Sequence, residues 1–339
     1  MTPLAILGLL GLAGFGVYYH RRSLLARLIG LSRPRYRVTV TQGIPVPMPD
    51  GVRLMTDHYS PQASGTFPTV LIRTPYGRGG ALGGFPAQRF AERGYHVIVQ
   101  DARGCFDSEG EFRSHVNEAT DGRATLDWIG QQPWFNGALG TWGPSYLGYM
   151  QWAVAIDAPP FLKALVPSIT SSQNFDVTHP DGAFGLETRL RWSQMMHTQD
   201  ERRKQPLWKR LSQTRSDERN LEAAFFHLPL IESDTVATGE VVPLYRDVLT
   251  HGRQDEPFWQ ARDHSTGVSR ITVPVHLIGG WYDYYLRGVL ADYAVLRAAG
   301  RRPYLTIGPW FHAHPGGMMT MLREGLTWFF LPYIFHRAG

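Results

Sequence analysis

The sequence predicts an α/β fold, in which a mostly parallel β-sheet is covered by helices on both faces. Short apolar runs recur from residue 38 onward, and helical patterns separate several of them. Strands that are apolar on both faces are typical of parallel sheets, because the crossover helices bury both faces. Hydrophobic residues make up 43% of the 339 residues and charged residues 19%, which excludes a disordered chain.

The first segment of the chain differs from the rest. Residues 3–19 carry no charged side chain, and a run of about 17 apolar residues is at the lower limit for crossing a bilayer. No charge precedes the run and no A-x-A site follows it, so we expect a transmembrane helix that anchors the chain rather than a cleaved signal peptide. A poor signal peptide and a core helix remain as alternatives.

The net charge of +5 comes from the residues that follow this apolar run. The stretch after the apolar run contains six arginines, which are Arg21, Arg22, Arg27, Arg33, Arg35 and Arg37. Without these six, the chain has 28 basic residues against 29 acidic ones. The remaining chain is nearly neutral, so we expect no nucleic-acid partner. The arginines instead predict a single-pass membrane protein whose main part lies on the cytoplasmic side.

Residues 1–37 are therefore interpreted as a membrane anchor with a basic juxtamembrane segment. Within it, Leu24, Leu28 and Leu31 are spaced as on one face of a helix, with Arg27 between them. A short helix of this kind can lie on the anionic inner leaflet. An ordinary linker helix is the alternative.

The elements that follow support the fold class in order. Two strand-like stretches, RVTVTQG and VRLMTDHYS, flank the turn at residues 49–51 and predict an edge hairpin. Apolar runs predict buried strands at residues 69–72, 95–99, 138–141, 162–166, 273–278 and 303–307. Helices are expected at residues 118–132 and 145–156.

One long stretch interrupts this alternation. Residues 171–269 contain no strong strand signal, but they include helical patterns at 187–199 and 219–227. An insertion of this size in an α/β sheet usually covers the active site. We therefore expect an α/β core formed by residues 38–170 and 270–339, with a helical cap at residues 171–269 between its two parts.

Cys105 is the only cysteine, which excludes a disulfide framework and a cysteine-ligated metal site. No base or motif near Cys105 indicates a nucleophile. We expect no metal and no organic cofactor.

The most informative motif is Gly143-Pro144-Ser145-Tyr146-Leu147-Gly148, which ends the strand LGTW and begins an apolar helix. A serine in such a turn exposes its hydroxyl above the sheet, and the helix N-terminus offers N–H groups to an oxyanion. The common form of this turn is G-x-S-x-G. Here the second glycine stands one place later.

A serine nucleophile needs a base, and the base needs a carboxylate that orients it. Asp283 follows the predicted strand VPVHLIGG, and His312 follows the predicted strand PYLTIGPW. Both lie at carboxyl ends of strands, where α/β sheets place their catalytic groups. His314 is the rival base, Asp283 has the alternative role of a helix cap, and His276 is expected to be a core histidine.

Six motifs stand out along the sequence. They are RTPY (73–76), QDARG with SEGEF (100–112), QPW with NG (132–137), GPSYLG (143–148), GWYD (280–283) and GPWFH (308–312). Together these motifs resemble the cocaine esterase / X-Pro dipeptidyl-peptidase family of α/β-hydrolases, and the resemblance runs from Val38 to the C-terminus.

The resemblance implies an α/β-hydrolase fold and a catalytic triad of Ser145, Asp283 and His312. It also implies an oxyanion hole formed by the Tyr76 hydroxyl and the backbone N–H of Tyr146. The substrate pocket is only partly recognisable, with Trp192, Trp281 and Tyr285 as candidates, although aromatic residues in a cap often belong to its core. Family members usually carry a C-terminal jelly-roll domain, and this sequence stops at Gly339, where that domain would begin.

These features predict a serine hydrolase that cleaves an ester or amide through an acyl-enzyme, acting on a small molecule or short peptide. A carboxylesterase or amidase is the first interpretation. An X-Pro-type dipeptidyl peptidase is the second, although the predicted cap has no obvious acidic cluster for a substrate amine. A catalytically inactive, membrane-tethered interaction module is the alternative from another class. The sequence does not indicate an oligomeric state.

Overall fold

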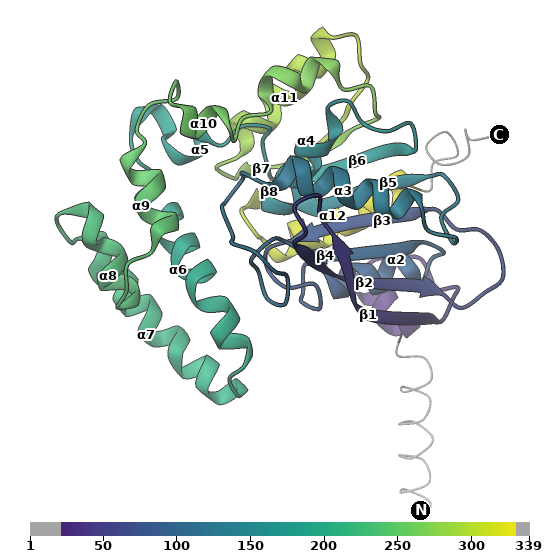
Figure 1. Cartoon of the computed structure of the whole chain (residues 1–339), viewed down its shortest axis with the longest axis horizontal. Coiled ribbons are helices and arrows are strands. Elements are labelled where there is room, and N and C mark those ends of the chain that lie inside the picture. The colour runs from purple at the N-terminus through teal and green to yellow at the C-terminus, as the bar shows by residue number, and fades with distance from the viewer. Residues whose placement is uncertain (1–21, 330–339) are drawn as a thin grey trace, which may run out of the picture.

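The computed structural model describes residues 22–329, and an eight-stranded sheet forms the centre of the protein (Figure 1). The strand order is β1-β2-β4-β3-β5-β6-β7-β8. The strands are β1 (Val38–Pro47), β2 (Arg53–Pro61), β3 (Thr69–Thr74), β4 (His96–Asp101), β5 (Leu139–Pro144), β6 (Leu162–Ser168), β7 (His276–Tyr282) and β8 (Tyr304–Phe311). All pairs from β4 to β8 are parallel, whereas β1–β2 and β2–β4 are antiparallel. The predicted mostly parallel sheet and its edge hairpin are confirmed.

The central strands are buried on both faces. Every residue of β3 and β4 is buried. Successive side chains of a strand point to opposite faces, so Val70 and Ile72 pack on one side of the sheet, while Leu71 and Ile98 pack on the other. This explains why the strands read as continuous apolar runs in the sequence.

Helices cover both faces of the sheet. On one side α2 (Gly84–Ala91) and α12 (Pro315–Phe329) contribute Phe90 and Leu326 to the core. On the other side, Leu126, Trp152 and Val289 pack against the sheet from three further helices. Those helices are α3 (Glu118–Gly130), α4 (Tyr146–Ala155) and α11 (Leu286–Ala298).

Residues 169–275, between β6 and β7, form a helical insertion with a small core of its own. Leu190, Leu221 and Tyr245 are buried in that core. The longest helices of the insertion project to one side of the sheet (Figure 1). Its elements are α5 (Phe175–Thr178), η1 (Pro180–Gly182), α6 (Leu186–Arg203), α7 (Leu207–Phe225), η2 (Leu230–Glu232), α8 (Ser233–Thr238), α9 (Pro243–Thr250), α10 (Pro257–Gln260) and η3 (Ser265–Arg270).

Most elements differ from the prediction by a few residues at their ends, and two of the differences have a visible cause. β7 begins at His276 rather than at residue 273. Pro274 has no N–H to donate to a neighbouring strand, and only an isolated bridge between Leu165 and Val275 precedes β7. The helix predicted at 219–227 is the end of the longer α7. The first turns of α7 carry the exposed apolar residues Leu207, Trp208 and Leu211, but residues 212–220 contain no apolar side chain, so the sequence shows no continuous apolar pattern along the helix.

The transmembrane helix predicted for residues 3–19 lies outside the described residues. Residues 22–28 form a helix whose Leu28 is exposed, whereas Leu31 packs against the core of the sheet. Arg22 Nε donates to Glu92 Oε1 at 2.9 Å, which ties this segment to α2. Among residues 22–329, no helix combines the length and the apolar character that crossing a membrane requires.

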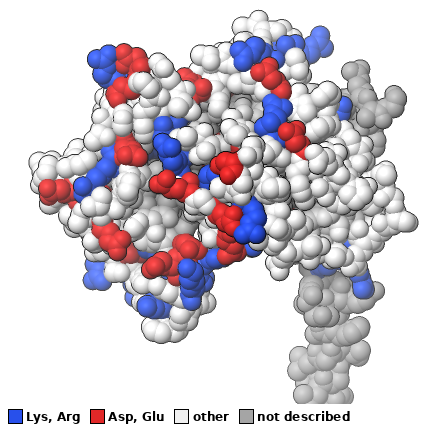
Figure 2. All heavy atoms as spheres, viewed as in Figure 1, with Lys and Arg blue, Asp and Glu red and all other residues white. Residues whose placement is uncertain are grey.

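Basic and acidic side chains alternate over the surface seen in Figure 2. Most of them lie over the helical insertion, and neither sign forms a continuous patch on this face. A nucleic-acid backbone binds to a surface of one sign, so this face offers no such footprint.

Asp292 on α11 is a buried carboxyl that makes stability depend on pH. Its two oxygens accept hydrogen bonds from the backbone N–H and the hydroxyl of Ser172, at 2.9 and 2.6 Å. Burial raises the pKa of Asp292 to about 7. The folded state therefore binds the proton more tightly than the unfolded state, and the free energy of unfolding falls as pH rises from about 4 to about 7.

We expect Asp292→Asn to remove this dependence, because the uncharged amide can accept from the Ser172 N–H with its oxygen and donate to the Ser172 hydroxyl with its NH2. The variant should be more stable than wild type at pH 8, by up to about 4 kcal/mol. Urea unfolding at pH 5 and pH 8 measures the difference. If the gap between variant and wild type is the same at both values, the charge of Asp292 does not cause the effect.

Candidate active site

Ser145 stands in a tight turn between β5 and α4. Its backbone has φ 56° and ψ −123°, a strained conformation for a non-glycine residue. The Ser145 N–H donates to the Ser168 carbonyl at 2.8 Å, which fixes the turn to β6. A Cβ at Gly143 would lie 2.4 Å from Leu147 Cβ, so the strand can approach the helix this closely only with glycine there.

Gly148 explains why this turn departs from G-x-S-x-G. A Cβ at Gly148 would lie 2.5 Å from Thr170 Cγ2, in the segment after β6. Leu147, at the position that usually holds glycine, instead packs into the core of the sheet. The close approach between α4 and the segment after β6 therefore lies one residue later than the second glycine of G-x-S-x-G, and a glycine occupies that later position.

The structure brings Ser145, Asp283 and His312 together from the ends of three strands. His312 Nε2 lies 3.0 Å from Ser145 Oγ, and His312 Nδ1 lies 2.9 Å from Asp283 Oδ2. The Asp283 side chain is fully buried, and its other oxygen accepts the Tyr285 N–H at 2.8 Å. A hydroxyl, an imidazole and a carboxylate in this order form the arrangement that activates a serine nucleophile.

The other two histidines considered from the sequence have different environments. His314 Nδ1 accepts hydrogen bonds from the N–H groups of Gly316 and Gly317, at the start of α12. His276 is buried within β7, with Nε2 at 2.9 Å from Thr306 Oγ1, and burial lowers its pKa to about 4. Only His312, of these three, lies beside Ser145.

Tyr76 lies in the loop after β3 and presents its hydroxyl at the same site. Trp192 Nε1 donates to the Tyr76 oxygen at 3.1 Å. Because an indole N–H can only donate, the Tyr76 oxygen is the acceptor and its own proton can be given to another group. Burial raises the pKa of Tyr76, while hydrogen bonds with Trp192 and Ser145 lower it less. Tyr76 therefore keeps its proton at neutral pH.

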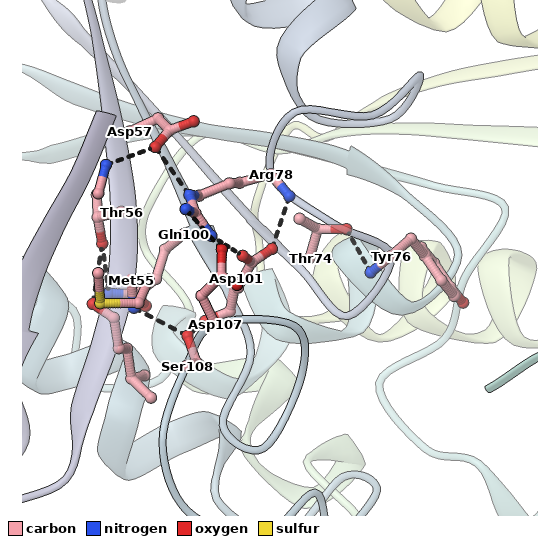
Figure 3. A network of polar contacts seen from close by, with 12 residues as sticks. Met55, Thr56, Asp57, Thr74, Tyr76, Arg78, Gln100, Asp101, Asp107 and Ser108 are labelled. Carbon is pink, nitrogen blue, oxygen red and sulfur yellow. Dashed lines mark hydrogen bonds and ion pairs between the residues drawn. The ribbon is translucent and has the colours of Figure 1, made fainter. Parts of the chain in front are cut away.

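A network of ion pairs holds the loop that carries Tyr76 (Figure 3). Arg78 donates from its backbone N–H to Asp101 at 2.6 Å, and from its guanidinium to Asp57 at 2.8 Å, to Asp107 at 3.0 Å and to Asp101. The Tyr76 ring points away from this network. The loop is thus fixed on one side while Tyr76 extends from the other.

Tyr146 has two separate contributions to the site. As the first residue of α4, its backbone N–H has no acceptor within the helix. Its buried hydroxyl donates to Glu118 Oε1 at 2.7 Å and accepts from the His115 N–H at 2.8 Å. Arg73 lies 3.4 Å from the second oxygen of Glu118, so a buried network supports the turn from below.

The three predicted pocket residues are placed differently. Trp192, on α6, contacts Tyr76 and stacks on Tyr146 with ring centroids 5.9 Å apart. The Tyr285 ring is buried 5.6 Å from the His312 ring. Trp281, by contrast, is 61% exposed at the end of β7.

Sequence reasoning missed two residues at this site. Tyr284 stacks on His312 with ring centroids 4.4 Å apart, and its place directly after Asp283 was a signal that could have identified it. Arg189, on α6, lies near enough to Tyr285 for its charge to lower the pKa of that tyrosine, although burial has the larger, opposite effect. Its sequence environment gave no signal, because the contact depends on how the helical insertion packs.

Metal ligands and the thiol of Cys105 are the other groups of the described residues that bear on the chemistry of the site. Among residues 22–329, no group of three or more His, Cys, Asp or Glu side chains is arranged to hold a metal ion. Cys105 is buried, and burial raises the pKa of its thiol. A thiol of raised pKa is a poor nucleophile.

Comparison with known proteins identifies the family. The sequence profile of the X-Pro dipeptidyl-peptidase (S15) family matches residues 50–314. The chain belongs to this family. The chain is also 34% identical over 310 residues to the cocaine esterase of Rhodococcus sp. (strain MB1 Bresler). That match covers 85% of this chain and 52% of the esterase.

Solved structures show that the S15 chain has the predicted α/β-hydrolase fold. An aminopeptidase from the marine sediment archaeon Thaumarchaeota archaeon superposes with a TM-score of 0.71 at 22% identity, over 90% of this chain and 56% of its own. An α-amino acid ester hydrolase gives 0.68 at 21% identity, over 91% and 56%. The chain thus spans about half the length of these relatives.

Proposed function

We propose that this protein is a carboxylesterase that hydrolyses small esters through an acyl-enzyme. The observation that carries the proposal is the position of His312, within hydrogen-bond distance of both Ser145 and Asp283. The similarity to cocaine esterase points to the same reaction.

The reaction follows from these positions. Ser145 Oγ attacks the ester carbonyl while His312 Nε2 takes its proton, and Asp283 stabilises the resulting imidazolium. The Tyr76 hydroxyl and the Tyr146 N–H donate hydrogen bonds to the oxyanion. His312 then gives the proton to the departing alcohol, and a water molecule, activated by His312, releases the acid and restores Ser145.

A second candidate is an X-Pro-type dipeptidyl peptidase, which the name of the family favours. Such an enzyme needs a carboxylate for the free amine of its substrate. Among the described residues, the carboxylates that bond His312 and Tyr146 are already engaged: Asp283 bonds His312 and the Tyr285 N–H, and Glu118 bonds Tyr146 and faces Arg73. We therefore favour the esterase.

A direct comparison of two substrates tests this choice. Purified protein should hydrolyse p-nitrophenyl butyrate with a far higher kcat/KM than Gly-Pro p-nitroanilide. A preference for the anilide would favour the peptidase, and turnover of neither substrate would favour the inactive interaction module.

Tyr76→Phe should lower kcat for ester hydrolysis by about 100- to 1000-fold, with little change in KM, because it removes one of two oxyanion donors. Steady-state kinetics measure the split. Tyr245→Phe is a matched control, since its buried hydroxyl donates to the Leu230 carbonyl inside the helical insertion. Equal kinetics for Tyr76→Phe and Tyr245→Phe would exclude the Tyr76 hydroxyl from the oxyanion hole.

We further propose that residues 3–19 anchor the protein in a membrane, with the residues after them on the cytoplasmic side. The apolar run and the six arginines after it support this topology. The full chain should sediment with membranes and resist protease added outside intact cells. A chain without residues 1–21 should become soluble. If both chains fractionate alike, the run is not an anchor.

A further inference from the structure

Arg189 is a buried cation without a carboxylate partner. It lies on the inner side of α6 and is 5% exposed. No Asp or Glu oxygen of residues 22–329 lies within 4.0 Å of its guanidinium, and its Nε is buried with no hydrogen-bond partner. Removing a charge from water without a partner is costly, so the protein keeps this group at the expense of stability.

Other buried arginines of the core do have carboxylate partners. Arg73 lies 3.4 Å from Glu118, Arg103 bonds Asp121 at 2.6 Å, and Arg93 lies 3.5 Å from Glu92. The unpaired state of Arg189 is therefore not a general property of the buried arginines in this fold.

Arg189 faces the proposed reaction centre. It precedes Trp192 by three residues, so both side chains lie on one face of α6. Trp192 donates to the Tyr76 hydroxyl, while the nearby charge of Arg189 acts on Tyr285, whose ring lies 5.6 Å from that of His312. The charge of Arg189 lowers the pKa of Tyr76, Tyr285 and His115, although burial has the larger effect on each. The guanidinium is thus close to both the oxyanion donor and the base.

We infer that Arg189 binds a carboxylate of the substrate, so that the enzyme prefers esters that carry an anionic group a few bonds from the scissile carbonyl. This inference rests on the proposed esterase function and specifies its substrate class. A guanidinium matches a carboxylate with two parallel hydrogen bonds. The substrate would supply the negative charge that the protein itself does not provide.

Two matched pairs of esters test the inference and distinguish where the carboxylate lies. In the first pair, mono-p-nitrophenyl adipate carries a carboxylate in its acyl group, and p-nitrophenyl hexanoate is its neutral counterpart. In the second pair, 4-acetoxybenzoate carries a carboxylate in its leaving group, and its methyl ester is the neutral counterpart. In at least one pair, wild type should favour the anionic ester, and Arg189→Gln should lower the anionic-to-neutral ratio of kcat/KM by about 10- to 100-fold. Arg189→Lys should retain part of that preference.

Arg191→Gln is the matched control, because Arg191 lies on the same helix but is partly exposed and bonds Glu218 at 2.7 Å. It should keep the wild-type ratio. A merely structural role for Arg189 would lower the rates of anionic and neutral esters equally, and this result would overturn the inference. An anionic-to-neutral ratio of kcat/KM that Arg189→Gln leaves unchanged in both pairs would also overturn the inference. If wild type hydrolyses no ester at all, the proposed function fails instead.

Discussion

Replacing Ser145 with alanine should lower ester turnover by about 10⁶-fold and abolish labelling by a fluorophosphonate probe. The variant loses the oxygen that lies 3.0 Å from His312 Nε2, and with it the only atom that can form the acyl-enzyme. The turn itself should survive, because the Ser145 N–H that bonds the Ser168 carbonyl remains. Turnover of p-nitrophenyl butyrate and gel fluorescence after labelling measure the two effects.

The control for this experiment is Ser212→Ala, whose hydroxyl donates to the Lys209 carbonyl in α7. It should react with the probe as wild type does. Mass spectrometry of the labelled wild type should locate the adduct on Ser145. An adduct on another serine that persists in Ser145→Ala would refute the assignment of the nucleophile.

Asp283→Asn should lower kcat by about 10⁴-fold. In wild type the Asp283 carboxylate lies 2.9 Å from His312 Nδ1, so it keeps the proton there and leaves Nε2 free to accept one from Ser145. An amide can present N–H to Nδ1 and favour the wrong tautomer, and it no longer stabilises the imidazolium. Stopped-flow or steady-state kinetics with an activated ester measure the loss.

Asp292→Asn provides a matched control, since it makes the same substitution at a buried carboxyl on α11 that contacts Ser172. Its kcat should stay near that of wild type. Circular dichroism of both variants would separate loss of fold from loss of chemistry. A kcat for Asp283→Asn within tenfold of wild type would show that Asp283 does not orient the base.

The sheet and the positions of the three central residues could be predicted because local sequence determines them. Buried parallel strands leave apolar runs, and the ends of those runs place Ser145, Asp283 and His312 at one edge of the sheet. The sequence shows that the second glycine of the turn, Gly148, stands one place later than in G-x-S-x-G, but it does not show why. The contact between Gly148 and Thr170 joins α4 to the segment after β6, and no local pattern reports such a contact.

The sides of the site formed by the helical insertion could not be predicted in the same way. Trp192 was expected in a substrate pocket, yet its indole N–H is bonded to Tyr76 more than 100 residues earlier. Trp281 lies at the end of β7, two residues before Asp283, but its side chain is exposed. Arg189 looks like any helical surface arginine in the sequence, and only the packing of α6 makes it buried.

The helical insertion also has an evolutionary consequence. It leaves the sheet after β6 and returns before β7, so its helices can change without altering the strand register that positions Ser145, Asp283 and His312 (Figure 1). Substitutions within this segment can therefore reshape the side of the site that the insertion forms while the strand ends stay in place. Trp192 limits that freedom, because its indole N–H donates to the Tyr76 oxygen.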